Sequence, residues 1–385
     1  MLRHFLKLAF VAVLAISAGT ALADDPSALA QSTCDKALAY LKSQQKPDNS
    51  WQTDTDPLGF TSLALRAFMA DQNHDADEPF LDKGFDKLLS NQLEDGGIYK
   101  DVLAGYNTAV AISALAAAKE AEYQAPIKKA VEYLKSLQWS DKIVGVSSDI
   151  TVTNDKDPRY GGWGYGKRGR PDLSNTQMAL DALHDAGLKS DDPAYQAALK
   201  FVTRCQNLSE TNDQTWSSDD GGFIYTPIDG GMSPAGDLML GNRRLLRSYG
   251  SMTYAGLKSM IYAGLTHDDP RVKAAWGWIS KNFTVDENPG MSAVGPEKSQ
   301  DGFFYYCYTM SHALSAYGQP VITDAAGKPH DWRIALVEKL ASIQKPDGSF
   351  IGTSNWMENS PVLSTSYTVI TLEEAKNDLK LHPPQ

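Results

Sequence analysis

Two basic clusters stand out in a chain that is acidic overall. The formal net charge of the 385 residues is −11 at pH 7. Arginine and lysine nevertheless gather in two places, at Lys167, Arg168, Arg170 and at Arg243, Arg244, Arg247. Guanidinium groups near a helix N-terminus bind phosphate and carboxylate groups. Arg244 and Arg247 are therefore candidate ligand-binding residues for an anionic group, and the alternative is that they pair with neighbouring carboxylates.

Asp301, Cys307 and His312 are the side chains best suited to hold a metal ion. Carboxylate, thiolate and imidazole groups all bind zinc. Five residues separate Cys307 from His312, which is nearly one and a half helical turns, so the two do not share a helix face. We therefore expect no metal and no cofactor, with this triad as the alternative metal site. Asp301 and His312 are also the secondary candidates for catalytic residues.

Two pairs of carboxylates are the remaining candidates for acid catalysis, Asp54 with Asp56 and Asp219 with Asp220. A carboxyl group that neighbouring charges keep protonated is a general acid. The first pair lies in a turn ended by Pro57, and the second belongs to a glycine-containing turn. We expect neither pair to be catalytic.

Aromatic residues are frequent in segments that we expect to be buried. Tyr249, Tyr254, Tyr306 and Trp163 are candidate ligand-binding residues, because aromatic walls bind apolar molecules. The same or adjacent segments contain Tyr262, Tyr305, Tyr308, Tyr317, Tyr367 and Phe223. Ordinary packing is the alternative role for each of them.

These residues lie in or between the copies of a motif that recurs six times. An amphipathic helix ends in Leu-x-x-x-Gln or a variant of it, and a turn rich in Gly and Asp and then an aromatic residue follow. The last position of the helix motif is occupied by Gln45, Gln92, Gln138, Gln206, Asn282 and Gln344. We expect each glutamine to bond backbone carbonyls or amides near a helix end, where such groups lack partners. Insertions that contain the basic clusters lengthen repeats three to five.

A second helix of different composition follows each turn. These segments are rich in Ala, Ser, Thr and Tyr, and we expect them at residues 59–70, 105–119, 174–187, 249–264, 306–317 and 364–376. Helices without a charged face are buried on most sides, whereas the Leu-x-x-x-Gln helices carry charges on one side and belong outside. The sequence therefore predicts an all-α fold, an (α/α)6 toroid of six helix pairs. All inner helices then begin at one rim, where their dipoles favour an anion.

The Leu-x-x-x-Gln…Gly-x-Trp/Phe repeats resemble the QW repeats of squalene and hopene cyclases and the related repeats of protein prenyltransferase β subunits. The resemblance extends from about residue 32 to the C-terminus. It implies an α/α toroid with an isoprenoid-like or lipid ligand in its cavity. Arg244 and Arg247 also resemble the basic pair that precedes the zinc-binding segment of the prenyltransferases.

The catalytic groups of these families have no counterpart here. The Asp-x-Asp-Asp motif of the cyclases does not occur in the sequence. Gly250 and Met252 stand where the resemblance would place the aspartate and cysteine ligands of the prenyltransferase zinc. The resemblance therefore implies the fold without classical cyclase or zinc prenyltransferase chemistry.

The first 23 residues are typical of a cleavable signal peptide. Arg3 and Lys7 precede an apolar run, and an Ala-x-Ala cleavage site ends at Ala23. The run is too short to span a membrane, and no later stretch is long enough. We expect a periplasmic or secreted protein in which residues 24–385 form a single toroid domain with six repeats. Three cysteines permit one disulfide at most, namely Cys34, Cys205 and Cys307.

Three functions remain open. The first is binding of a small apolar or amphiphilic ligand, anionic ones included, and export together with the missing catalytic groups favours it. The second is a terpenoid cyclase-like or transferase-like enzyme of variant mechanism. The third is a glycan-active enzyme that uses His312 and neighbouring tyrosines. The acidic surface excludes nucleic acid as a partner, and the sequence does not determine the oligomeric state.

Overall fold

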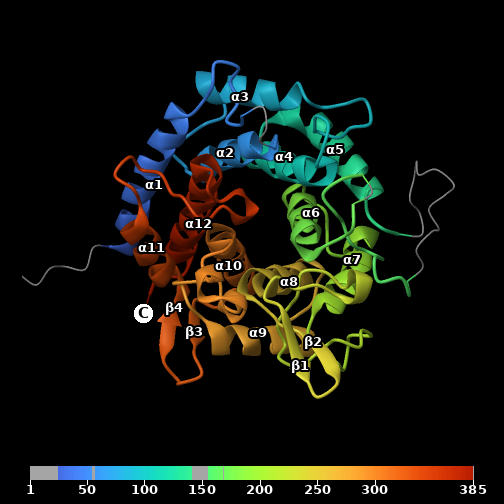
Figure 1. Cartoon of the computed structure of the whole chain (residues 1–385). Helices are drawn as coiled ribbons and strands as arrows, with labels where there is room; N and C mark the ends of the chain where they lie inside the picture. Colours follow the sequence, from blue (N-terminus) through green and yellow to red (C-terminus); the bar gives the residue numbers. More distant parts are fainter. Residues whose placement is uncertain (1–24, 54–56, 141–154, 168, 385) are drawn as a thin grey trace, which may run out of the picture.

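The computed structural model describes residues 25–53, 57–140, 155–167 and 169–384. The expected signal peptide, the pair of Asp54 and Asp56, and Arg168 lie outside these ranges. Within them the chain forms a ring of helices (Figure 1).

Twelve α-helices in the described part of the chain alternate between an outer and an inner layer (Figure 1). The outer helices are α1 (Pro26–Ser43), α3 (Pro79–Leu89), α5 (Gln124–Ser136), α7 (Pro193–Cys205), α9 (Pro270–Asn282) and α11 (Trp332–Ile343). The inner helices are α2 (Gly59–Ala70), α4 (Ala104–Ala118), α6 (Leu173–Asp185), α8 (Gly250–Tyr262), α10 (Phe303–Tyr317) and α12 (Pro361–Leu381). Proline begins α1, α3, α7 and α9, a position where its missing N–H is no loss. The predicted all-α fold is confirmed.

The inner helices close into a complete ring. Each packs against the next one along the chain, and α12 returns to pack against α2 and α1. Their small side chains permit this close packing: in α4 every residue from Gly105 to Leu115 is buried except Tyr106, which is half-buried. The observed helices begin within three residues of the predicted starts. The predicted toroid of six helix pairs is therefore confirmed.

The remaining regular structure belongs to the connections between the helices. Strands β1 (Asp237–Leu240) and β2 (Arg243–Leu246) form one antiparallel hairpin, and β3 (Val321–Thr323) and β4 (Pro329–Asp331) form another. Short 3₁₀ helices occupy Ala121–Tyr123, Ile228–Gly230, Met291–Val294, Pro296–Lys298 and Asn355–Met357. Along the described residues, no helix has both the length and the apolar character that crossing a bilayer requires.

The repeated glutamines connect neighbouring repeats, as expected. The Nε2 group of Gln138 donates to the carbonyl of Gly161 in its own turn and to that of Ala194 in the next outer helix, at 2.9 Å each. The same pair of hydrogen bonds, one to the residue's own turn and one to the next outer helix of the ring, is made by Gln45, Gln92, Gln206 and Gln344. Asn282, the shorter residue of the fifth repeat, donates to the carbonyl of Trp278 in its own helix. Glutamine is long enough to reach both carbonyls, and it binds the carbonyls rather than the amides of the turn.

Threonine hydroxyls of the inner helices accept hydrogen bonds from the backbone amides that follow the turns. In five repeats, the amide that follows the turn donates to a threonine Oγ1 at 2.9–3.1 Å. The pairs are Trp51 with Thr61, Ile98 with Thr108, Trp163 with Thr176, Phe223 with Thr253, and Phe350 with Thr365. These five turns are thus fixed to both layers, and the starts of the inner helices that follow them are held at one level.

Candidate functional site

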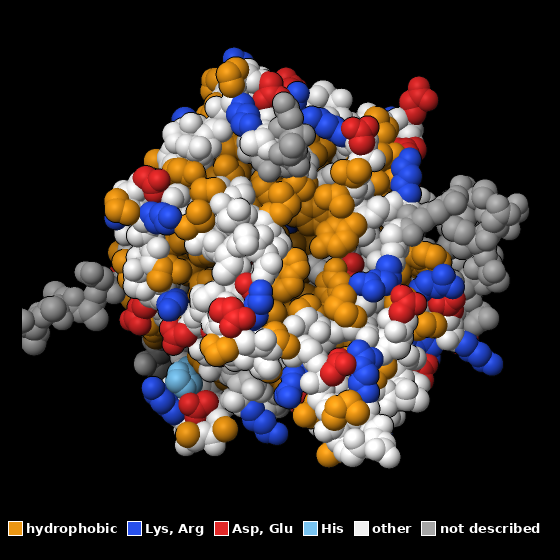
Figure 2. Space-filling view, in the orientation of Figure 1, with side chains coloured by type: hydrophobic (Ala, Val, Ile, Leu, Met, Phe, Trp, Pro, Cys, Tyr) orange, Lys and Arg blue, Asp and Glu red, His pale blue; other side chains and the backbone are white. Residues whose placement is uncertain are grey.

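A cavity of about 170 Å³ lies where the inner helices begin. A residue from the first three positions of every inner helix contributes to its wall, and loops complete it. Eight of the wall residues are aromatic, namely Phe60, Tyr106, Tyr165, Tyr225, Tyr249, Tyr305, Trp356 and Tyr367. We call this space the aromatic cavity. Figure 2 shows hydrophobic side chains gathered around the hollow in the middle of the ring.

The tyrosine hydroxyls of this wall stay protonated at neutral pH. Burial raises the pKa of Tyr305 well above its ordinary value and raises that of Tyr106 to about 12. The hydroxyl of Tyr305 lies 2.9 Å from Ser174 Oγ and accepts a hydrogen bond from Gln177 Nε2 at 3.1 Å. The wall is therefore uncharged along most of its surface, which suits an apolar ligand.

Glu358 is the one carboxylate-bearing residue of this wall, and the wall contains no lysine or arginine among the described residues. Its Oε1 accepts the backbone amide of Tyr305 at 2.8 Å, in the first turn of α10. The Oε2 atom of Glu358 is buried and has no hydrogen-bond partner in the described part of the chain. Burial raises the pKa of this carboxyl group to about 7, although the amides at the start of α10 oppose the shift. Near neutral pH the group therefore exists in both protonation states.

A constrained loop holds Glu358 in place. Trp356 and Met357 both have positive φ, of 52° and 64°, a left-handed conformation that non-glycine residues seldom adopt. The carbonyl of Glu358 accepts hydrogen bonds from the amide of Gly352 and from Ser364 Oγ, at 2.7 Å each. Glu358 could not be predicted from the sequence, because a single glutamate before the last inner helix forms no recognisable motif.

Only one of the expected ligand-binding residues, Tyr249, contributes to the described wall of the aromatic cavity. Trp163 is buried in a turn and donates from its indole to the carbonyl of Leu134 at 2.8 Å. Tyr254 and Tyr306 pack against each other with ring centroids 5.7 Å apart. The hydroxyl of Tyr306 donates to a backbone carbonyl at 2.6 Å. These three side chains make packing contacts in the structure.

Arg244 and Arg247 lie at the β1–β2 hairpin. Arg244 binds both carboxylate oxygens of Asp237, at 2.6 and 3.0 Å, and a carbonyl at 2.9 Å. Arg247 donates to the carbonyl of Asp237 at 3.3 Å. In the other cluster, Lys167 lies 3.4 Å from Asp95. Neither Arg244, Arg247 nor Lys167 contributes to the wall of the aromatic cavity, and an anion site at these residues stays a prediction.

The carboxylates at Asp219 and Asp220 belong to their turn. Asp219 accepts the amide and hydroxyl of Ser209 at 2.8 and 2.7 Å. Asp220 accepts the amide of Gly222 and the hydroxyl of Ser248. Both therefore stabilise loop structure.

Asp301, Cys307 and His312 are not brought together. Asp301 precedes α10 and accepts hydrogen bonds from Thr353 and Asn355, whereas His312 lies toward the other end of that helix. Cys307 is buried, and burial raises the pKa of its thiol. In the described part of the chain, one group of three such side chains has all its ligand atoms within 4.8 Å, and it consists of Asp75, Asp77 and Glu120.

A second cavity, of about 590 Å³, lies toward the C-terminal ends of the inner helices. Most of its wall is polar, and its charged or titratable side chains are Arg66, His184, Asp185, Tyr262, His312 and Glu374. We call this space the polar cavity.

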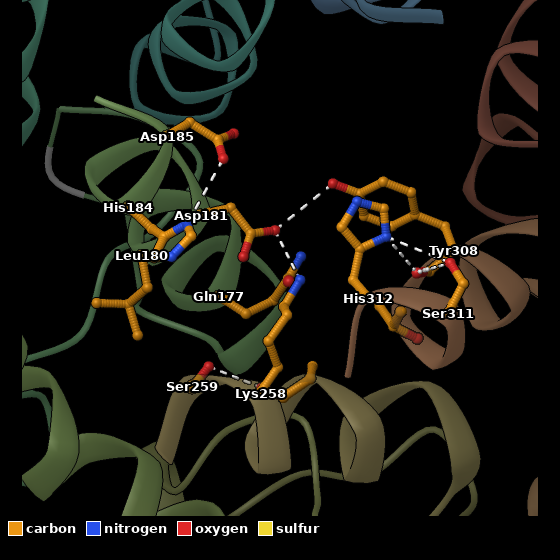
Figure 3. Close-up of polar contacts among 12 residues, drawn as sticks. Gln177, Leu180, Asp181, His184, Asp185, Lys258, Ser259, Tyr308, Ser311 and His312 are labelled. Atoms are coloured by element: carbon orange, nitrogen blue, oxygen red, sulfur yellow. Dashed lines mark hydrogen bonds and ion pairs between the residues drawn. The ribbon is translucent and has the colours of Figure 1, made fainter. Parts of the chain in front are cut away.

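A buried charge cluster lies between the two cavities, at the middle of the inner helices (Figure 3). Lys258 of α8 is fully buried and binds Asp181 of α6, with Nζ 2.7 Å from Oδ2. The hydroxyl of Tyr308 on α10 lies 3.5 Å from the same oxygen and accepts a hydrogen bond from Arg66 at 2.9 Å. Burial lowers the pKa of Lys258 and raises that of Asp181, and their ion pair opposes both shifts. The cluster therefore places an ion pair between α6 and α8 inside the ring, while the Oδ1 atom of Asp181 is buried without a hydrogen-bond partner among the described residues.

Solved structures with the same architecture are known from other proteins. The type II terpene cyclase MstE from Scytonema matches over 91% of this chain and 100% of its own, with 12% identity and a TM-score of 0.55. The fold is an α/α toroid. Two glycosidases share it: the GH76A α-1,6-mannanase from Salegentibacter (10% identity, 92% of this chain and 99% of the other, TM-score 0.54) and an unsaturated glucuronyl hydrolase specific for heparin (11%, 92% and 98%, 0.57).

These likenesses define the fold and leave the activity open, because enzymes of different chemistry share the toroid. No protein-family model and no curated protein matches the sequence. One structure of the terpene cyclase contains geranylgeranyl dihydroxybenzoate as substrate (13% identity, 92% of this chain and 99% of the other, TM-score 0.55). The expected resemblance to a terpenoid cyclase-like toroid is thereby confirmed at the level of fold.

Proposed function

We propose that the chain is an exported protein that binds a small apolar or amphiphilic molecule in the aromatic cavity, without classical cyclase or zinc prenyltransferase chemistry. The observation that carries the proposal is the aromatic wall, to which every inner helix contributes a residue from its first turn. Such a wall offers a large apolar contact area and flat π faces. A prenylated or otherwise hydrophobic molecule fits this chemistry.

The composition of the wall also limits the polar part of the ligand. Glu358 is the only carboxylate-bearing residue of the described wall, and lysine and arginine do not contribute to it. A phosphate group in the cavity would therefore lack a cationic partner. We infer that the part of the ligand inside the cavity is uncharged.

A binding titration with an isoprenoid alcohol tests the proposal. Farnesol is added to the purified protein, and the fluorescence of the aromatic residues reports occupancy of the cavity. Leu363→Trp places a bulky ring in the wall and should weaken binding at least tenfold. Leu381→Trp is the matched control, because Leu381 lies on the same helix and is 74% exposed.

Melting curves of both variants separate loss of binding from loss of folding. Equal binding by Leu363→Trp and Leu381→Trp, with both folded, would rule out the aromatic cavity as the site. Absence of binding to the unmodified chain would rule out the isoprenoid class.

The export part of the proposal has its own test. N-terminal sequencing of the protein from its native cells should give a chain that begins at Asp24. A chain that retains Met1 in the cytoplasm would contradict export.

A further inference from the structure

The polar cavity contains an imidazole with one free ring nitrogen. His312 is 8% exposed, and its Nδ1 lies 3.0 Å from the carbonyl oxygen of Tyr308. Because a carbonyl only accepts hydrogen bonds, Nδ1 carries the hydrogen and Nε2 of the neutral ring carries a lone pair. Figure 3 shows Nε2 pointing away from Ser311 and the Tyr308 carbonyl. Among the described residues Nε2 has no hydrogen-bond partner, and it belongs to a residue of the cavity wall.

The surroundings keep this imidazole neutral. Burial lowers the pKa of His312 well below its ordinary value, and the positive charges of Lys258 and Arg66 lower it further, whereas Asp185 opposes them. Nε2 is therefore a hydrogen-bond acceptor at neutral pH. The same two cations make the space beside His312 unfavourable for a cationic ligand.

Two carboxyl groups of the wall, those of Asp185 and Glu374, are further acceptors. Asp185 stays ionised, because Arg66 and His184 outweigh its burial and lower its pKa to about 2. Glu374 contributes a second carboxyl group, whose pKa is raised by burial. Arg66, the strongest donor, is already 3.4 Å from Asp185 and bound to the hydroxyl of Tyr308 at 2.9 Å. The carboxylate of Asp185 disfavours an anionic ligand.

The wall also includes a flat aromatic surface. The rings of His184 and Tyr262 stack with centroids 4.1 Å apart and planes inclined by 5°. Both side chains belong to the cavity wall, and Tyr262 is only partly buried. Acceptors around a stacked aromatic surface match a molecule with several hydroxyl donors and an apolar C–H face.

We propose that the polar cavity is a second ligand-binding site, specific for a neutral polyhydroxylated molecule of monosaccharide size. His312 Nε2 and Asp185 accept ligand hydroxyls, and the ring of Tyr262 packs against the ligand face. A volume of about 590 Å³ is ample for one sugar ring. This site is separate from the aromatic cavity, since the charge cluster of Asp181, Lys258 and Tyr308 lies between them.

Saturation-transfer NMR with D-glucose, D-mannose and D-galactose tests the site. We expect at least one sugar to bind the unmodified chain. His312→Leu should weaken binding at least tenfold, whereas His312→Gln should retain most of it, because the glutamine Oε1 is also an acceptor. Leu363→Trp, in the wall of the aromatic cavity, is the control and should bind the sugar normally.

Charged probes distinguish the class of ligand. Putrescine and D-glucuronate are added in parallel with the neutral sugars, and melting curves confirm that the variants are folded. Tighter binding of putrescine or glucuronate than of every neutral sugar would overturn the proposal, and so would failure of all three sugars to bind. Equal sugar binding by folded His312→Leu and His312→Gln would exclude His312 as an acceptor. Because farnesol binding is measured on another cavity, either proposal can fail without the other.

Discussion

The proton affinity of Glu358 depends on its surroundings in the folded chain. The pKa of the carboxyl group rises from 4.5 to about 7 on folding, chiefly through burial. The folded chain therefore holds this proton more tightly than the unfolded chain does. The resulting stabilisation is fully present below about pH 4.5 and is lost as the pH rises through 7.

Glu358→Gln should remove this pH dependence. Between pH 4 and pH 8 the unmodified chain should lose about 3 kcal/mol of unfolding free energy that the variant does not lose. Urea unfolding at the two pH values measures the difference. Glu297→Gln, at an exposed position, should behave like the unmodified chain. If both variants keep the same pH dependence as the unmodified chain, the raised pKa is wrong.

Loss of the buried charge of Lys258 should destabilise the folded chain strongly. Lys258→Met leaves the carboxylate of Asp181 buried without its partner, which should lower the unfolding free energy by about 3–5 kcal/mol. The double variant Asp181→Leu/Lys258→Met should recover most of that loss. As a control, Lys273→Met breaks the exposed pair with Asp268 and should change the stability by less than about 1 kcal/mol. Additive losses in the double variant would contradict the pairing.

At the scale of elements, a glutamine links its turn to the next outer helix in five of the six repeats. Gln138→Ala removes a buried donor and leaves the carbonyls of Gly161 and Ala194 without it, so we expect a loss of about 1–3 kcal/mol. Chemical denaturation of the variant measures this loss. Gln44→Ala is the control, because Gln44 is exposed and donates to Ser43. Equal stabilities of the two variants would show that the bridge contributes nothing.

The elements were predictable because the sequence repeats them. Periodic apolar residues and a turn rich in Gly or Asp recur in every copy, and five of the six copies contain the glutamine. A helix pair with one polar face packs its apolar face against its neighbours. The threonines that accept hydrogen bonds from the turn amides, such as Thr61 and Thr176, also recur, but their partners lie 10 to 30 residues earlier along the chain. A contact across that separation becomes apparent only in three dimensions.

The sites were much less predictable than the elements. Asp181 and Lys258 are 77 residues apart and meet only because α6 and α8 are neighbours in the inner ring. Glu358 acquires its properties from burial and from a left-handed loop, neither of which leaves a sequence signature. His312 was predicted as a candidate together with Asp301, but Asp301 precedes α10, whereas His312 lies about 14 Å along that helix from its first residue at 1.5 Å per residue. Residue type identified His312, and position in the ring determined its partners.

At the scale of the whole molecule, the sixth repeat closes the ring onto the first. Gln344 donates to the carbonyl of Thr33 in α1 at 2.9 Å, although 311 residues separate them. Gly348 follows in the same turn with φ of +88°, and a Cβ atom there would lie 2.3 Å from the carbonyl oxygen of Lys36. The turn of Gly348 is therefore in direct backbone contact with the first helix.

Gly348→Ala should weaken the contact between the turn of the sixth repeat and α1. The substitution combines an unfavourable φ with a clash against backbone, and we expect a loss of more than about 2 kcal/mol of unfolding free energy. Gly327→Ala separates the two causes, because Gly327 has φ of +81° and open space around it. It should lose only about 1 kcal/mol. Thermal melts compare the stabilities of the two variants. Equal melting temperatures would mean that the turn of Gly348 is not tightly packed against α1.

Closure also fixes how many copies of the motif the chain can contain. An open solenoid of helix pairs gains or loses a copy at either end, since each unit contacts only its neighbours. Here α12 packs against α2 and so occupies the place that an added helix pair would need. Gln344 of the sixth repeat already donates to the carbonyl of Thr33 in the first outer helix, so no partner is left for a seventh copy at that junction. Growth of this molecule is therefore restricted to loops, and the long insertions of the middle repeats are where such growth has occurred. Duplication or deletion of a single helix pair would change the curvature of every junction, so descent with a different copy number requires the whole circle to be rebuilt.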